Sequence, residues 1–473
     1  MLKLLIYSLV ACTFFSIIVF PWFTAVMYYA NGIMQPKYVW PWTFPDFAVS
    51  KTLAIFSIIA LLGTFLSKKI DVNIYKTPQS YALLAMWGLI HLSEILSPYP
   101  VYFAGVRAEI VLAALNTIII MYFVGLGLLS HINDYKKSLL FMTIMFALIT
   151  VYYVYWANDM YLSSRWDMFR NGRLKSPPGT SIGDQNALSC LIVMGMPFIL
   201  LGFFYCKNFF IKWSCLGIMP LLWHSLFLFG SRGAMLAVLC TTIALLKLLK
   251  QDKSIASPFI EFKYVKSFKV LIGIGFVVAL LVQGGAMLDR SSSTAAQAKA
   301  GGEEPLNPRL ISWKVGQKLI FDFPLLGAGP QRFQMAATSL YPGESSHVAH
   351  NTFLNFAANT GLPVGLLFLY LFWLSYKNYK FCVNNTIDQI PLLSYLNKAC
   401  AASLLGYFIS ALFLDMIVFE AFYFILMINA AKLFVFQQLI QKQLVNNNVS
   451  ATMAEVQNNK RLKRDKNGIP ITD

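Results

Sequence analysis

Arginine is the residue of this chain best suited to binding phosphate, because a guanidinium is a flat fork that grips phosphate oxygens in pairs. The chain has ten arginines, and only Arg461 and Arg464 lie near the C-terminus. The other eight are Arg107, Arg165, Arg170, Arg173, Arg232, Arg290, Arg309 and Arg332. If these eight share one side of a membrane, they indicate a phosphorylated ligand there. Loop solvation and lipid headgroup contacts are the alternative for about half of them.

His350 is the histidine best placed for chemistry, since it opens the string His350-Asn351-Thr352-Phe353-Leu354. An imidazole titrates near neutral pH, so it can take a proton from an attacking hydroxyl. The alternative is that His350 only caps a helix. Asn351 either orients the histidine or caps that helix, and capping is favoured. We expect loop or packing roles for the remaining histidines, which are His91, His131, His224 and His347.

No metal site or cofactor is expected. The chain has no Asp-x-Asp triplet and no Cys-x-x-Cys spacing, and its seven cysteines fall in hydrophobic stretches or inner loops. Neither of these metal-binding patterns therefore indicates a metal site.

The composition indicates a membrane protein. Of 473 residues, 57% are hydrophobic and 12% charged, about half the charge of an ordinary soluble protein, and the mean hydropathy is +0.60. This excludes a soluble enzyme, a disordered chain and a small disulfide scaffold. Because a spanning helix needs about 20 apolar residues, we predict an all-α bundle of about twelve spans. They are 2–20, 47–66, 80–96, 108–130, 138–157, 187–206, 211–229, 233–249, 268–284, 352–375, 395–414 and 417–440.

The lysine distribution predicts that both termini are cytoplasmic. With the N-terminus inside, inner segments hold 24 of the 38 basic residues, and these are nearly all lysines, as the positive-inside rule expects. The first span has no convincing cleavage site after it and is interpreted as a retained helix. The net charge of +17 is divided between two sides of the bilayer, so no nucleic-acid partner is expected.

Four regions follow from this topology. Residues 1–284 would form spans one to nine, 285–351 a large outer loop, 352–440 the last three spans, and 441–473 a disordered cytoplasmic tail. Within the loop, apolar residues at helical spacing predict one surface helix with Arg309 in its first turn, followed by a tight glycine turn at 323–329.

Several motifs resemble the O-antigen ligase and polymerase superfamily, over about residues 180–375, and the large outer loop before the tenth span is similar to its ligase branch. These motifs are Gly230-Ser231-Arg232-Gly233, Arg309-x-x-x-Trp313, Pro324-Leu325-Leu326-Gly327-x-Gly329, the His350 string, and Gly361-Leu362-Pro363-Val364-Gly365. One position departs from the family pattern, because Asn359 stands where an acidic residue is common.

The resemblance implies a bacterial inner-membrane glycosyltransferase with a periplasmic active site. It would move a glycan from undecaprenyl diphosphate to a hydroxyl of a lipid A-core acceptor, with inversion and without a metal. His350 would be the general base, and Arg232 and Arg309 would bind the diphosphate. Accessory candidates are Arg107, Arg165, Arg173, Asn351 and Asp415. Asp415 could pair with an arginine, hold the histidine tautomer or be a turn residue. Glu420 is a weaker candidate for the same roles as Asp415.

Three alternatives remain open from the sequence. A protein O-oligosaccharyltransferase or a polysaccharide polymerase would share this fold and differ only in its acceptor. A lipid or polysaccharide transporter is less favoured, because transporters place ionisable groups near the membrane midplane, whereas the polar groups here cluster at one face.

Overall fold

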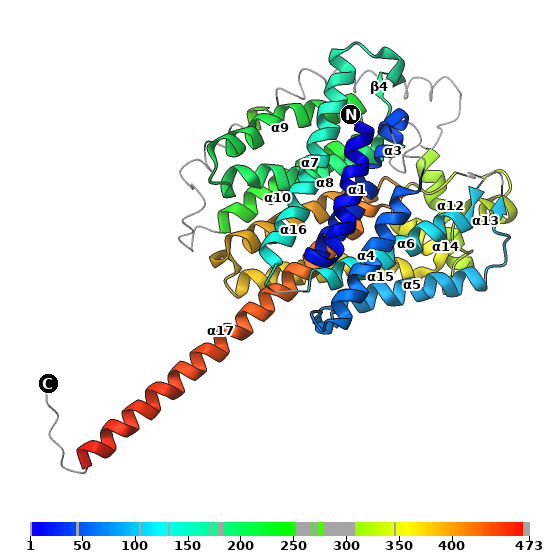
Figure 1. Cartoon of the computed structure of the whole chain (residues 1–473). Helices are drawn as coiled ribbons and strands as arrows, with labels where there is room; N and C mark the ends of the chain where they lie inside the picture. Colours follow the sequence, from blue (N-terminus) through cyan, green and yellow to red (C-terminus); the bar gives the residue numbers. More distant parts are fainter. Residues whose placement is uncertain are drawn as a thin grey trace.

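The computed structural model describes residues 2–43, 47–103, 106–130, 133–170, 172–177, 183–251, 308–344 and 347–466, with a few positions between 267 and 277. Within them the fold is almost entirely helical (Figure 1). The longer helices are α1 (Leu2–Val19), α2 (Pro21–Met34), α4 (Val49–Leu66), α5 (Pro78–Ile95), α6 (Ala108–Leu128), α7 (Tyr135–Leu162), α8 (Gln185–Tyr205), α9 (Phe209–Phe229), α10 (Arg232–Gln251), α12 (Pro308–Asp322), α15 (Leu362–Asn384), α16 (Pro391–Ala411) and α17 (Glu420–Lys466).

Short elements connect these helices. The short α-helices are α3 (Pro36–Val39), α13 (Phe333–Leu340) and α14 (Thr352–Thr360), and the 3₁₀ turns are η1 (Pro41–Thr43), η2 (Val72–Tyr75), η3 (Trp166–Met168) and η6 (Ile387–Gln389). Two antiparallel two-residue hairpins pair β1 (Tyr102–Phe103) with β2 (Val106–Arg107), and β3 (Phe169–Arg170) with β4 (Arg173–Leu174).

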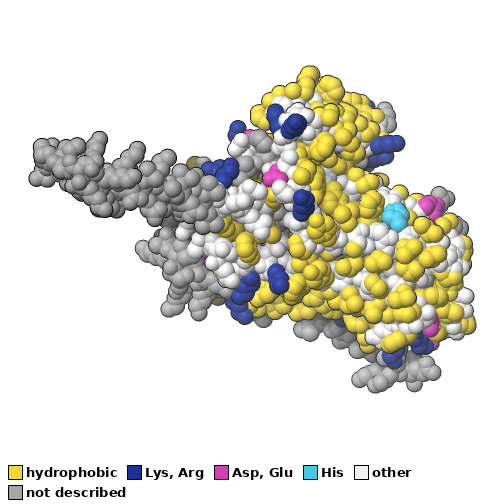
Figure 2. Space-filling view, turned by 90° about the horizontal axis from the view of Figure 1, so that it is seen from below, with side chains coloured by type: hydrophobic (Ala, Val, Ile, Leu, Met, Phe, Trp, Pro, Cys, Tyr) yellow, Lys and Arg dark blue, Asp and Glu magenta, His cyan; other side chains and the backbone are white. Residues whose placement is uncertain are grey.

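The protein is a polytopic, all-α membrane protein, as the composition predicted. Among the described residues, eight helices are long and apolar enough to cross a bilayer: α4, α6, α7, α8, α9, α10, α16 and α17. In the view of Figure 2, hydrophobic side chains cover most of the described surface and basic residues are scattered. The count of twelve spans remains a prediction. The span expected at 268–284 and the loop at 285–307 lie almost wholly outside the described residues.

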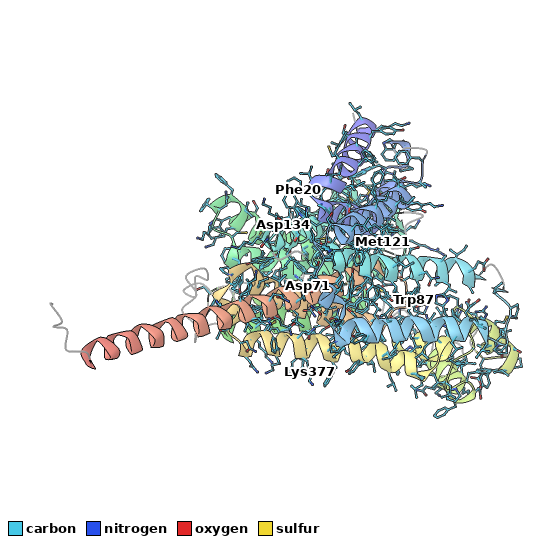
Figure 3. All side chains as sticks on the ribbon, turned by 60° about the horizontal axis from the view of Figure 1, so that its bottom comes forward. Phe20, Asp71, Trp87, Met121, Asp134 and Lys377 are labelled. Atoms are coloured by element: carbon cyan, nitrogen blue, oxygen red, sulfur yellow. The ribbon has the colours of Figure 1, made fainter. Side chains whose placement is uncertain are left out.

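Two helices, α8 and the first half of α17, form the buried centre of the bundle. Every residue of α8 from Ala187 to Phe204 is buried, because this helix is apolar on all sides and packs against α7, α9, α10 and α16. The first half of α17 is buried from Ala421 to Phe436 in the same way. Hydrogen bonds also join distant segments: Trp87 donates to Asn116 of α6, and Gln438 of α17 donates to Asp71 (Trp87 and Asp71 are labelled in Figure 3).

The helix α2 was not expected from the sequence. Pro21 starts it at a position where the missing N–H costs nothing, and it buries Trp22 and Tyr29 against neighbouring helices. At 14 residues it is shorter than a spanning helix needs. Thr24, Asn31 and the tyrosines interrupt its apolar residues, so the segment does not meet the criterion of a long apolar run.

The span predicted at 352–375 is two helices. The chain breaks at Gly361, which has φ +93, so α14 ends at Thr360 and α15 begins at Leu362. Since a left-handed backbone is open to glycine and strained for other residues, the glycine inside the apolar run marks the break. The HN string therefore starts a short helix at the end of the bundle rather than a span.

Two expectations about the C-terminal half differ from the structure. The helix α17 does not end near 440 but continues to Lys466 and projects from the bundle (Figure 1), since no glycine or proline interrupts 441–467. Lys398 and Lys432, which the predicted topology assigns to cytoplasmic segments, are buried. Lys398 forms an ion pair with Asp388 at 2.7 Å, and Lys432 donates to Asn397 at 2.6 Å.

Candidate active site

The predicted surface helix and glycine turn are present as α12 and the residues that follow it. Arg309 lies in the first turn of α12, and Trp313 follows one turn later. The indole N–H of Trp313 donates to the carbonyl oxygen of Ala349 at 2.7 Å. This bond fixes the backbone directly before His350. A small apolar core beneath it, formed by Val315, Leu319, Ala328, Phe333, Ala336, Ala337, Ala349, Leu354 and Ala358, joins α12, α13 and α14.

The glycine turn pairs with the end of α14. The N–H of Ala328 donates to the carbonyl of Ala358 at 3.0 Å, and that of Gly329 donates to Asn359 at 2.7 Å. Gly327 and Gly329 have φ +66 and +109, and a side chain at Gly327 would overlap the backbone of Asn359. The two separated motifs of the sequence therefore form one interlocked unit.

Asn359, the position that departs from the family pattern, is part of this scaffold. It is fully buried, and its side-chain oxygen accepts the N–H of Phe333 at the start of α13 at 2.7 Å. Its amide nitrogen donates to the carbonyl of Asn355 at 3.0 Å. Because both ends of the amide are used, Asn359 holds α13 and α14 together.

His350 lies at the edge of this unit in a left-handed backbone conformation, with φ +47. Asn351 is the N-cap of α14, and its side chain accepts the N–H of Leu354 at 3.1 Å, so the capping interpretation of Asn351 is confirmed. The imidazole is half-buried. Burial lowers its pKa, the charge of Arg309 lowers it further, and Asp184 acts in the opposite direction. The side chain is therefore biased toward the neutral form that a base requires.

A cavity of about 70 Å³ lies beside this unit. It is lined by Arg173, Asn186, Gly230, Ser231, Arg232, Gly233, Ala234, Arg309, Ser410, Phe413 and Leu414. Arg232 is exposed at the first turn of α10, where the backbone N–H groups and the helix dipole favour an anion. Burial and then the charge of Arg232 lower the pKa of Arg309. Two guanidiniums that repel each other in one cavity are suited to binding an anion.

Arg173 reaches the same cavity from the β3–β4 hairpin and is held in place. Its Nε donates to the carbonyl of Phe229 at 2.8 Å, and its Nη2 donates to Asn186 Oδ1 at 2.7 Å. His350 does not line the cavity but is linked to it through Arg309, whose charge acts on His350. The structure thus brings His350, Arg232, Arg309 and Arg173 to one end of the bundle.

Two more of the eight arginines, Arg165 and Arg332, are engaged outside this cluster. Arg165 is exposed and pairs with Asp167, with Nε and Nη2 at 2.9 and 3.0 Å, as ordinary loop solvation predicts. Arg332 is buried and forms a two-pronged ion pair with Glu94, so it is structural. The side chain of Arg107, together with Arg290 and His131, lies outside the described residues.

Asp415 lies in the link between α16 and α17, directly beside the start of α14. Burial raises its pKa, and contacts with Asn355 and the backbone of Ile417 oppose this effect. The flanking residues Leu414 and Met416 are bound to the hydroxyl of Thr352. The side chain of Asp415 therefore contacts an asparagine of α14. Glu420 lies against Gly32 of α2, on a different helix pair.

Asp184 and Asn186 were missed from the sequence. Asp184 is the N-cap of α8, and its charge acts on both Arg309 and His350. An Asp-x-Asn pair directly before a predicted span is a capping signal, but capping alone gives no indication that Asn186 lines a cavity together with three arginines.

Residues 217–369 match a family model described as O-antigen ligase. Over these residues the chain is similar to the O-antigen ligase family. The matched segment contains Arg232, Arg309 and His350, and it ends inside α15. A comparison with curated proteins gives no match. The match to the family model supports an O-antigen ligase or polymerase type of function, and the eight long apolar helices among the described residues support a multi-pass membrane protein.

Proposed function

We propose that this protein transfers a glycan from undecaprenyl diphosphate to a hydroxyl of a lipid A-core acceptor. The observation that carries the proposal is that Arg232 and Arg309 share one cavity while Arg309 also acts electrostatically on His350. A diphosphate leaving group needs fixed cations near its oxygens, and the hydroxyl nucleophile needs a base.

Arg232 and Arg309 are the groups proposed to bind the diphosphate. Within the part of the chain that the structure describes, no hydrogen bond or ion pair engages the guanidinium of Arg232, which leaves its fork open to a ligand. The first turn of α10 adds backbone N–H groups beside it. A diphosphate leaves without a proton, so the site needs cations and no general acid.

His350 is the proposed base. Its lowered pKa keeps the imidazole neutral at physiological pH, ready to take the proton of the acceptor hydroxyl. Attack by that hydroxyl on the face opposite to the departing diphosphate inverts the anomeric carbon. Each step uses groups of this chain and calls for no metal ion.

The proposed location is the bacterial inner membrane with the site in the periplasm. The three arginines that line the cavity lie in the β3–β4 hairpin, at the α9–α10 turn and in the first turn of α12. Lysines lie at or near the opposite ends of the helices: Lys207 follows α8, Lys212 is in the first turn of α9, and Lys377 is in the C-terminal half of α15 (Lys377 is labelled in Figure 3). Lysine-rich connections favour the cytoplasmic side.

Two acceptor classes remain as alternatives to lipid A-core: a protein hydroxyl, as in an O-oligosaccharyltransferase, and a growing glycan, as in a polymerase. The clustering of arginines at one end of the bundle favours transfer chemistry over transport, which needs ionisable groups deep in the membrane.

The test is in vitro transfer from a defined undecaprenyl-diphosphate glycan by purified protein in nanodiscs. Lipid A-core, a serine-containing acceptor protein and a lipid-linked glycan are offered in parallel, with and without EDTA. Transfer to lipid A-core that survives EDTA supports the proposal. Transfer to one of the other acceptors selects the corresponding alternative, and loss of transfer in EDTA that is restored by added metal contradicts the metal-free chemistry.

A further inference from the structure

A chain of hydrogen bonds links the Asp184 carboxylate to the cavity. Its Oδ1 accepts the backbone N–H of Asn186 at 3.0 Å and the side-chain amide at 2.9 Å, and its Oδ2 accepts the same amide at 3.1 Å. The carbonyl end of Asn186 then accepts Arg173 Nη2 at 2.7 Å. The carboxylate therefore determines which way the Asn186 amide faces, and the amide fixes the guanidinium.

The same carboxylate supplies negative charge to a strongly cationic site. The charged and titratable groups that act on His350 are Arg309 on α12, His347 in its own loop and Asp184 before α8. Arg309 and His347 disfavour a positive imidazole, and Asp184 favours it. Arg309 is likewise pushed toward its neutral form by Arg232 and toward its charged form by Asp184.

The opposing effects of these charges on His350 matter when His350 takes the proton of the acceptor hydroxyl in the proposed transfer. The O–H bond of the acceptor breaks and its proton forms an N–H bond with His350, while the acceptor oxygen bonds to the anomeric carbon. The bond between that carbon and the diphosphate breaks, and its electron pair leaves with the diphosphate. The charge of Arg309 disfavours the imidazolium formed in this step, so a counter-charge stabilises it until the proton passes to solvent.

We propose that Asp184 is a positioning residue of this site, which orients Arg173 through Asn186 and stabilises the imidazolium of His350. The inference rests on the proposed function for the role of the imidazolium. The link between Asp184 and His350 is independent of that function and can be measured without any substrate.

A purely structural role is the competing explanation, because Asp184 caps α8. Asp184→Asn separates the two roles: asparagine is as good an N-cap as aspartate but carries no charge. Asp184→Ser is a second cap-competent, uncharged variant. Asp167→Asn is the matched control, because Asp167 is an exposed carboxylate of the neighbouring loop that pairs with Arg165.

The experiment measures the rate at which diethyl pyrocarbonate acylates His350 in the full-length protein as a function of pH, with the peptide followed by mass spectrometry. The reagent reacts with neutral imidazole, so the midpoint reports the pKa of His350. We expect a midpoint at lower pH in Asp184→Asn and Asp184→Ser than in the wild type and Asp167→Asn. Equal midpoints in all four proteins, or failure of both Asp184 variants to fold, would overturn the inference.

The pH profile of glycan transfer separates this inference from the proposed function. A shifted acylation midpoint with no matching shift of the acidic limb of transfer would support the Asp184–His350 link and remove His350 as the base. Equal acylation midpoints together with an acidic limb of transfer that depends on His350 would remove the inference and leave the proposed function intact.

Discussion

The indole of Trp313 donates to the carbonyl oxygen of Ala349 across 2.7 Å. This bond joins the helix that carries Arg309 to the residue directly before His350. It therefore helps to set the distance between Arg309, which is proposed to bind the diphosphate, and His350, the proposed base. These two residues lie 41 positions apart in the chain.

Replacing Trp313 with phenylalanine should uncouple these two groups. The ring still packs, but the hydrogen bond, worth about 1 kcal/mol, is lost and His350 is less well placed. We expect kcat for transfer to fall roughly five- to tenfold, with little change in KM for the donor, as measured by initial rates. Trp42→Phe, at a 77% exposed indole, is the control. Equal rates for the two variants would show that this bond does not position the base.

Arg232→Lys and Arg309→Lys should weaken donor binding while retaining the positive charge. Lysine cannot grip two phosphate oxygens at once, and a charged hydrogen bond contributes about 1.5–3 kcal/mol. We expect KM for the donor to rise roughly 10- to 100-fold in each variant. Arg165→Lys, on an exposed arginine paired with its neighbour, should behave as the wild type. A donor KM unaffected at both cavity positions would remove the diphosphate role.

Gly361→Ala should destabilise the interlocked unit of α12, the glycine turn and α14. Gly361 has φ +93, and a Cβ there would overlap the carbonyl of Leu325. Gly343→Ala is a matched control, since Gly343 has φ +94 but no atom within 4 Å of its Cβ position. Both variants carry backbone strain of about 1 kcal/mol, so the thermal unfolding temperature should fall further for Gly361→Ala. Equal decreases would mean that the turn and α14 are not packed as described.

The pH dependence of transfer should reflect the environment of His350. A base works in its neutral form, so activity rises as pH passes upward through its pKa. Burial and Arg309 lower that pKa, so the acidic limb of kcat/KM should lie below the ordinary histidine value of 6.5. Arg309→Gln removes a charge that lowers the pKa, so the limb of its residual activity should move to higher pH. A limb that moves to lower pH in this variant would contradict the assignment.

Much of this organisation could be predicted from the sequence. Apolar runs predicted most spanning helices, and Arg309, Trp313 and the glycines predicted α12 and its turn. The break at Gly361 was missed, because hydropathy continues unchanged through it. Asp184 was missed as a site residue because its local pattern is that of a helix cap, and only the three-dimensional arrangement links it through Asn186 to Arg173 and brings its charge to act on Arg309.

The role of each loop arginine could not be predicted from the sequence either. Arg332 and Arg173 have equivalent settings in the sequence, in polar segments between apolar runs. Arg332 forms an ion pair with Glu94, which lies 238 residues away in the sequence, whereas Arg173 lines the cavity. Long-range ion pairing of this kind cannot be deduced from one sequence, so the chain alone could not rank its loop arginines.

The most direct test of the central claim compares donor binding and transfer in His350→Gln, with His347→Gln as the control from the same exposed loop. Binding of labelled undecaprenyl diphosphate to nanodisc-embedded protein is measured beside transfer from the glycan-loaded lipid. The role of His350 as general base predicts wild-type binding in both variants and a loss of transfer of roughly 100-fold or more in His350→Gln alone. Transfer within a few-fold of wild type in His350→Gln would contradict it.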